Sequence, residues 1–160
     1  MLALTNRAYP DRNVSEKEQR LIARAVAVLQ RRMVGGEPLS SPDAAGEFLR
    51  LRLAPLDREV FFLLLLDTRH RVVAAEMVFM GTIDGAEVHP RIVARLALKH
   101  NAAAVICAHN HPSQNPEPSA ADRAVTARLK QALALLDIRL LDHFVVTAAG
   151  CTSLAARGWV

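Results

Sequence analysis

The sequence has few aromatic residues, few cysteines and no long hydrophobic run. Aromatic residues make up 4% of the 160 residues, so the core must consist mainly of aliphatic side chains. Two cysteines, Cys107 and Cys151, are too few for a disulfide framework, which excludes a small disulfide-stapled secreted fold. The longest apolar run, 60–66, is far too short to cross a bilayer. The N-terminal residues lack the apolar core of a signal peptide. We therefore expect a cytoplasmic protein with no membrane partner.

The chain does contain enough apolar residues for one domain with a core of its own. Hydrophobic residues make up 51% of the sequence, and 160 residues would be cramped for two full domains. The formal net charge is +4 and the sequence pI is about 9.7, which is compatible with a nucleic-acid or acidic partner. The excess of positive charge is too small to establish such a partner by itself.

Hydrophobic periodicity divides the chain into helices that alternate with buried strands. Helices are predicted at 15–33, 42–54, 90–100 and 119–136, and strands at 59–67, 72–80, 103–109 and 138–147. Strands that are apolar on both faces are typical of a sheet covered by helices on both sides, so we predict an α/β sandwich. The break after the first helix predicts an N-terminal helical extension, 1–37, followed by one domain, 38–160.

The most informative segment runs from His109 to Asp122. His109 and His111 end the predicted strand 103–109, and residues at i and i+2 of an extended chain point the same way. The Pro-rich stretch after them turns the chain back, and Asp122 arrives in the first turn of the next helix. Two imidazoles and one carboxylate, with a position left for water, are the ligand set of a catalytic zinc site. The segment predicts a metallohydrolase that binds one Zn²⁺ per chain.

The same segment resembles a known family. His-x-His, seven residues, Ser119, two residues and Asp122 match the metal-binding motif of the JAMM (MPN+) metalloproteases. The wording HNHPSxxxxPSxxD resembles the RadC branch of that superfamily, as do EVFFLLLLDTRHRVV, GTIDGAEVHPRIVARLALKHNAAAVICAHNHPS, LLDHFVV and ARGWV. The resemblance covers roughly residues 40 to 160. One position departs from the pattern, because RadC proteins usually carry Gly after His-Pro-Ser and this chain has Gln114, which adopts positive φ less readily.

The resemblance implies a fold, a reaction and two further site residues. The fold is a cytidine-deaminase-like three-layer sandwich, with a mixed central sheet and helices on both faces. The reaction is zinc-dependent hydrolysis of a peptide or isopeptide bond in a peptide or protein substrate. Glu59, just before the first core strand, matches the position from which JAMM proteins supply the glutamate that activates the zinc-bound water. Glu76 and Glu87 are the other upstream candidates. Ser119 is an N-cap by propensity and, by the match to the motif, a donor to the oxyanion.

Other features keep alternatives open. The stripe Arg91, Arg95 and Lys99 and the stripe Arg20, Arg24 and Arg31 could contact phosphate, or form solvated helix faces. With the RadC label of DNA repair, they suggest a second hypothesis, a protein that binds DNA or repair partners through these helices and whose metal site is not proteolytic. Metal-dependent phosphodiester hydrolysis ranks last, because a single zinc does not match the two-metal nuclease pattern. Asp142 and His143 could orient a metal ligand, or be structural. The sequence indicates no particular oligomeric state.

Overall fold

The computed structural model describes residues 15–34, 36, 39, 42–80 and 88–160, and the structural statements below concern those residues. The elements are α1 (Glu16–Met33), α2 (Pro42–Leu53), β1 (Val60–Leu66), β2 (Val72–Met80), α3 (Pro90–Lys99), β3 (Ala104–Asn110), α4 (Ala120–Ala134), β4 (Arg139–Val146) and β5 (Cys151–Ser153). The eight elements predicted from periodicity are confirmed to within a few residues, and β5 is an additional short strand.

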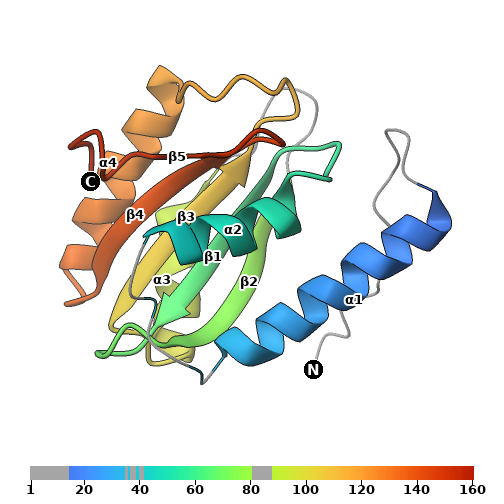
Figure 1. Ribbon diagram of the computed structural model, residues 1–160. Helices are drawn as coiled ribbons and strands as arrows, with labels where there is room; N and C mark the ends of the chain where they lie inside the picture. The colour runs from blue at the N-terminus through green and yellow to red at the C-terminus, as the bar shows by residue number, and fades with distance from the viewer. Residues whose placement is uncertain (1–14, 35, 37–38, 40–41, 81–87) are drawn as a thin grey trace.

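The strands form one mixed sheet in the order β2-β1-β3-β4-β5 (Figure 1). β1 and β2 form an antiparallel hairpin, and β1 also pairs antiparallel with β3. β3 and β4 are parallel and are connected through α4, whereas β5 returns antiparallel to β4. The predicted α/β class with a mixed sheet is confirmed.

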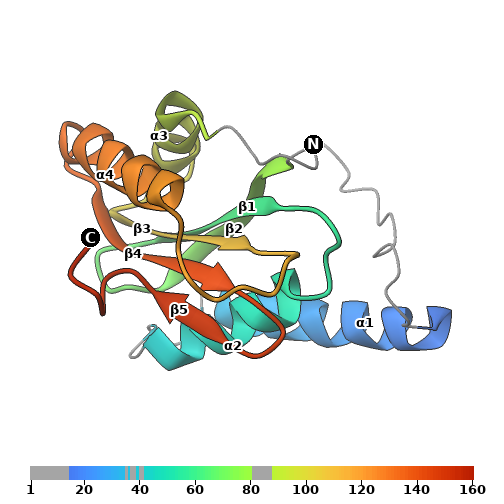
Figure 2. The same ribbon diagram turned by 90° about the horizontal axis from the view of Figure 1, so that it is seen from above.

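Helices cover both faces of this sheet. Successive residues of β1 point to opposite sides and are all apolar, so both faces need to be covered. Phe62, Leu64 and Leu66 belong to a core cluster with residues of α2. Phe61, Leu63 and Leu65 belong to a second cluster with residues of α3 and α4. Figure 2 shows α3 and α4 on one side of the sheet and α2 on the other, with α1 beside α2. Every residue of β1 and β3 is buried, and these strands are apolar except for His109 and Asn110 at the end of β3.

The topology brings several strand ends together at one edge of the sheet. The end of β3 lies opposite the beginning of β1, with Phe61 paired to His109. The parallel strand β4 ends at the same edge, with Val145 paired to His109 (Figure 2). Polar residues that follow or precede these strand ends are therefore brought close to one another. Within the described part of the chain, no helix has the length and apolar character needed to cross a membrane.

Candidate metal centre

The three residues selected from the sequence converge at this edge of the sheet. His109 Nε2 lies 3.0 Å from His111 Nε2 and 3.0 Å from Asp122 Oδ1, and His111 Nε2 lies 3.5 Å from Asp122 Oδ2. Two ligands bound about 2.0–2.1 Å from a tetrahedral zinc ion lie about 3.3–3.4 Å from each other. The donor atoms are therefore spaced nearly as a common ion requires, and the three side chains could hold a metal.

The charges at this centre are coupled. Burial alone raises the pKa of the Asp122 carboxyl, but hydrogen bonds from His109, His111 and Ser119 outweigh it, so the pKa lies far below its usual range. The hydrogen bond to Asp122 is the main reason why the pKa of His111 is raised, and the nearby negative charge of Glu59 adds to the rise. The site therefore holds an ionised carboxylate beside His111, an imidazole whose proton that carboxylate stabilises.

Ser119 caps α4 and orients the carboxylate of Asp122. Its side-chain oxygen accepts a hydrogen bond from the Asp122 backbone N–H at 3.1 Å, and its backbone N–H donates to Asp122 Oδ2 at 2.6 Å, which completes a capping box. The predicted N-cap is confirmed. The Ser119 hydroxyl also donates to Asp122 Oδ2 at 2.7 Å. Its hydrogen is therefore engaged by the ligand in this conformation, and the predicted donation to an oxyanion stays a prediction.

The loop after the histidines closes without the glycine usual in RadC proteins. Gln114 adopts φ = 63°, the left-handed conformation that glycine adopts most readily. Its Oε1 accepts a hydrogen bond from the backbone N–H of Ala148 at 2.8 Å, an interaction that glycine could not make. In the same loop, the carbonyl of Asn115 accepts from His111 Nδ1 at 2.8 Å, which leaves His111 Nε2 directed at the metal group.

Glu59 lies directly before β1 and is half-buried. The negative charge of its carboxylate contributes to the raised pKa of His111, so the two side chains lie within electrostatic range of each other. Of the other upstream glutamates, Glu76 lies in the interior of β2 and contacts His100 Nε2 at 3.1 Å. Glu87 lies outside the described residues. Glu59 is thus the described candidate that the structure associates with a metal ligand.

The structure separates Asp142 from His143, which the sequence treated as a pair. Asp142 accepts hydrogen bonds from the Ser153 hydroxyl at 2.6 Å and from the Ala155 N–H at 2.9 Å, so it holds the C-terminal segment. His143 is fully buried, and its Nε2 lies 2.8 Å from Nδ1 of the ligand His109. The two side chains point to opposite faces because they are neighbours on one strand. Of these two residues, only His143 contacts one of the three candidate metal ligands.

Sequence reasoning missed Thr126, which contacts the far side of His143. Its Oγ1 lies 2.6 Å from His143 Nδ1. Thr126 is fully buried and lies one helical turn after Asp122. That i, i+4 spacing from a predicted ligand was the only signal in the sequence. Cys107, two residues before His109 in β3, is buried, and burial raises the pKa of its thiol, so it remains protonated.

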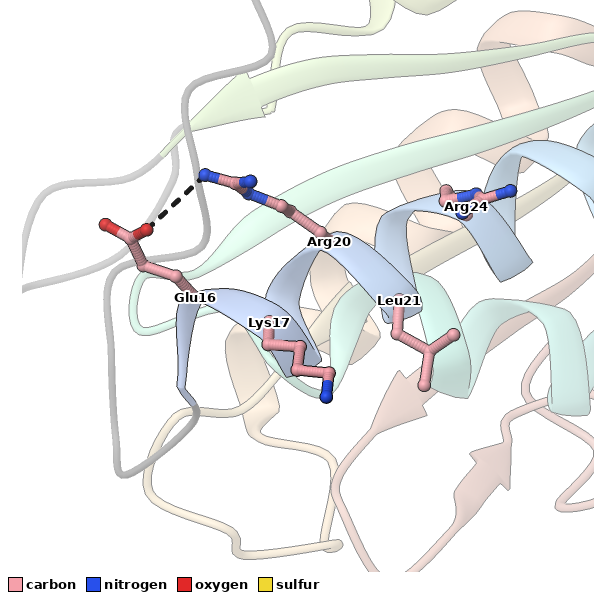
Figure 3. A pocket seen from close by; sticks show the side chains of 5 residues that line it. All are labelled: Glu16, Lys17, Arg20, Leu21 and Arg24. Atoms are coloured by element: carbon pink, nitrogen blue, oxygen red, sulfur yellow. Dashed lines mark hydrogen bonds and ion pairs between the residues drawn. The ribbon is translucent and has the colours of Figure 1, made fainter.

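A separate hollow lies along α1 (Figure 3). Among the described residues, its lining comes from that helix: Glu16, Lys17, Arg20, Leu21 and Arg24. Leu21 is 66% exposed, and the Glu16 carboxylate pairs with Arg20 at 3.5 Å across the open face of the helix. None of these residues belongs to the metal group.

Comparison with known proteins agrees with the motif. The family model described as "RadC-like JAB domain" matches residues 39–159. The chain belongs to this family. UPF0758 proteins of Xanthomonas campestris pv. campestris and Xanthomonas oryzae pv. oryzae are 62% and 60% identical to it over 125 residues, which is 78% of this chain and 56% of each relative. A UPF0758 protein of Vibrio cholerae is 49% identical over 144 residues, 90% of this chain and 91% of that relative. This RadC-like JAB chain thus spans little more than half of its Xanthomonas relatives, and α1 lies outside the matched range.

Proposed function

We propose that this RadC-like JAB domain is a zinc-dependent hydrolase of the JAMM type that cleaves a peptide or isopeptide bond. The observation that carries the proposal is the convergence of His109, His111 and Asp122 at spacings of 3.0, 3.0 and 3.5 Å. Two imidazoles and one carboxylate suit zinc, and three protein ligands leave one position for water or substrate. Membership of the JAB family supports the same reaction class.

In this proposal the chain supplies a base and a donor. Zinc, when bound, would acidify a water molecule and polarise the scissile carbonyl. Glu59 takes a proton from the attacking water, a C–O bond forms at the carbonyl carbon, and the C–N bond breaks as the proton passes from Glu59 to the leaving amine. Ser119 donates to the oxygen that becomes negative, which requires its hydroxyl to turn away from Asp122 Oδ2. A cytidine-deaminase-like classification of the fold and a cytoplasmic location belong to the same proposal.

Metal analysis and one variant of the base test the proposal. Protein purified without chelators should contain one zinc per chain, and the variant His109→Ala should contain none. Zinc-loaded protein should cleave members of a pooled library of internally quenched peptides and Lys-linked isopeptides. Glu59→Gln should retain the zinc and lose roughly 10²–10⁴-fold in rate, the usual contribution of general acid–base catalysis. Wild-type protein that contains no zinc would refute the proposal.

A second candidate function is binding of nucleic acid, and one surface favours it. α3 and α4 cover the same face of the sheet and contact each other. Their exposed cations are Arg91, Arg95, Lys99, Arg123, Arg128 and Lys130. The only acidic residue on either helix is Asp122, which is engaged in the metal group. We propose this cationic face, defined by those six residues, as the contact for phosphate.

A further inference from the structure

We propose that Thr126 and His143 are positioning residues that determine which nitrogen of His109 meets the metal. Thr126 fixes the direction of the hydrogen bonds made by His143, and His143 in turn keeps a proton on His109 Nδ1. Nε2 of His109 is then the one nitrogen available to an ion. The inference rests on the metal site of the proposed function and does not depend on hydrolysis.

The direction of the chain of hydrogen bonds is set at Thr126. Its Oγ1 lies 2.6 Å from the backbone carbonyl oxygen of Asp122 and 2.6 Å from Nδ1 of His143. A carbonyl oxygen can only accept, and a hydroxyl group has one hydrogen to donate. The Thr126 hydroxyl therefore donates to Asp122, and it can only accept from His143. His143 must carry a hydrogen on Nδ1.

The next step passes through His143 to His109. His143 is fully buried, and its two ring nitrogens contact a hydroxyl group and another imidazole, so burial favours the neutral ring. A neutral imidazole with hydrogen on Nδ1 has a bare Nε2 that accepts. That atom lies 2.8 Å from His109 Nδ1, which must be the donor. His109 Nε2 is left facing Asp122 Oδ1 at 3.0 Å, as the nitrogen through which His109 would bind an ion.

The arrangement forms a closed ring through one turn of α4. The series of hydrogen bonds begins at the backbone carbonyl of Asp122 and returns to the carboxylate of the same residue. It can begin there because Thr126 follows Asp122 by four residues, which is one turn of the helix. Thr126 and His143 are fully buried and His109 is 1% exposed, so water does not replace these hydrogen bonds. The buried ring of Phe61 packs against them, with its centroid 5.3 Å from that of His143 and 6.4 Å from that of His109.

A matched pair of variants separates the hydroxyl from the shape of the side chain. Thr126→Ser keeps the hydroxyl and Thr126→Val keeps the branched shape without it. Zinc affinity is measured by competition with a chromophoric chelator, with zinc as the only ligand. We expect Thr126→Val to bind zinc about 10–100-fold more weakly than wild type, as is usual when a supporting partner of a ligand is removed, and Thr126→Ser to stay close to wild type. Equal affinities of the two variants would overturn the inference.

Ring-nitrogen NMR of metal-free protein provides a readout that neither packing nor hydrolysis affects. In wild type and Thr126→Ser, His143 should carry its hydrogen on Nδ1 and have a bare Nε2. In Thr126→Val the hydrogen should move to Nε2, because Nδ1 has lost its acceptor. A wild-type spectrum with hydrogen on His143 Nε2 would overturn the inference. This test uses wild-type protein alone, so it remains decisive if Thr126→Val fails to fold. Protein that binds no zinc would refute the proposed hydrolase, whereas the His143 spectrum would still decide the inference.

Discussion

The side chain of Asn110 forms hydrogen bonds with both peptide groups that flank Glu59. Its Oδ1 accepts from the Val60 N–H at 2.8 Å, and its Nδ2 donates to the Arg58 carbonyl at 2.9 Å. Nδ2 also lies 3.2 Å from the carbonyl oxygen of Leu56. Asn110 stands between the two histidine ligands and is 1% exposed. The residue between the ligands therefore holds the backbone of the candidate base.

Replacement of Asn110 should loosen Glu59 and destabilise the fold. Asn110→Ala leaves buried backbone groups without partners, so we expect the free energy of unfolding to fall by about 2–4 kcal/mol. Hydrolysis of the peptide library should fall much more than zinc content. Urea unfolding and metal analysis measure the two effects. Asn115→Ala, at an exposed position of the loop that follows β3, is the control; it keeps the backbone carbonyl that contacts His111 and should have little effect on either. A small and equal effect of the two variants would contradict the role of Asn110.

Ser119 should matter for zinc affinity because its hydroxyl bonds the carboxylate ligand. Ser119→Ala removes that donor and the helix cap, so we expect zinc affinity to fall about 10–100-fold and stability to fall by about 0.5–2 kcal/mol. Ser119→Thr retains a hydroxyl and should remain close to wild type in both measurements. Chelator competition and thermal unfolding supply the values. Zinc affinity unchanged in Ser119→Ala would show that Asp122 is oriented without the hydroxyl.

The unusual backbone of Gln114 predicts an ordered pair of variants. Gln114→Ala keeps the strained φ of 63° and loses the hydrogen bond to Ala148. Gln114→Gly loses the same bond but removes the strain. The glycine variant should therefore be the more stable of the two by about 1 kcal/mol in chemical denaturation. The reverse order would mean that the loop does not adopt this conformation in solution.

Metal-free protein should become less stable as pH rises above neutrality. The hydrogen bond to Asp122 raises the pKa of His111 above its ordinary value of 6.5. A group whose pKa is raised by folding contributes stability that is complete below the unfolded pKa and is lost as pH rises through the folded pKa. In the presence of EDTA, the Tm of wild type should therefore decline from about pH 6.5 upward. His111→Asn should lack this decline, and an identical decline in the variant would assign the effect to other groups.

The cationic face of α3 and α4 predicts salt-dependent binding of DNA. Reversing Arg91, Arg95 and Lys99 to Glu removes half of its cations, so binding of a duplex should weaken and the dependence of log K on log salt should become shallower. The same change of charge at Arg20, Arg24 and Arg31 of α1 is the control. Fluorescence anisotropy at several salt concentrations measures both. Equal weakening by the two reversals would indicate general attraction, and no binding by wild type would remove this candidate function.

The sequence alone determined the elements and the candidate ligand group. Periodicity predicted each major strand and helix, because the apolar positions on an element are fixed by local geometry. His109 and His111 were predictable as a pair because alternation along a strand acts over two residues. Asp122 was predictable because the Pro-rich loop is short and Ser119 marks the start of a helix. Such information is contained within a few consecutive residues.

The tertiary structure alone decided how the ligand group is supported. His143 bonds His109 across 34 residues and Thr126 across 17, and Asn110 bonds Val60 across 50. None of these partners is specified by local pattern, because each contact depends on the order and register in which the strands pair. The same holds for Gln114, whose positive φ is accompanied by a hydrogen bond to Ala148, 34 residues away. The ligands could be read from spacing, whereas the hydrogen bonds that orient them arise only when the sheet brings distant residues within about 3 Å.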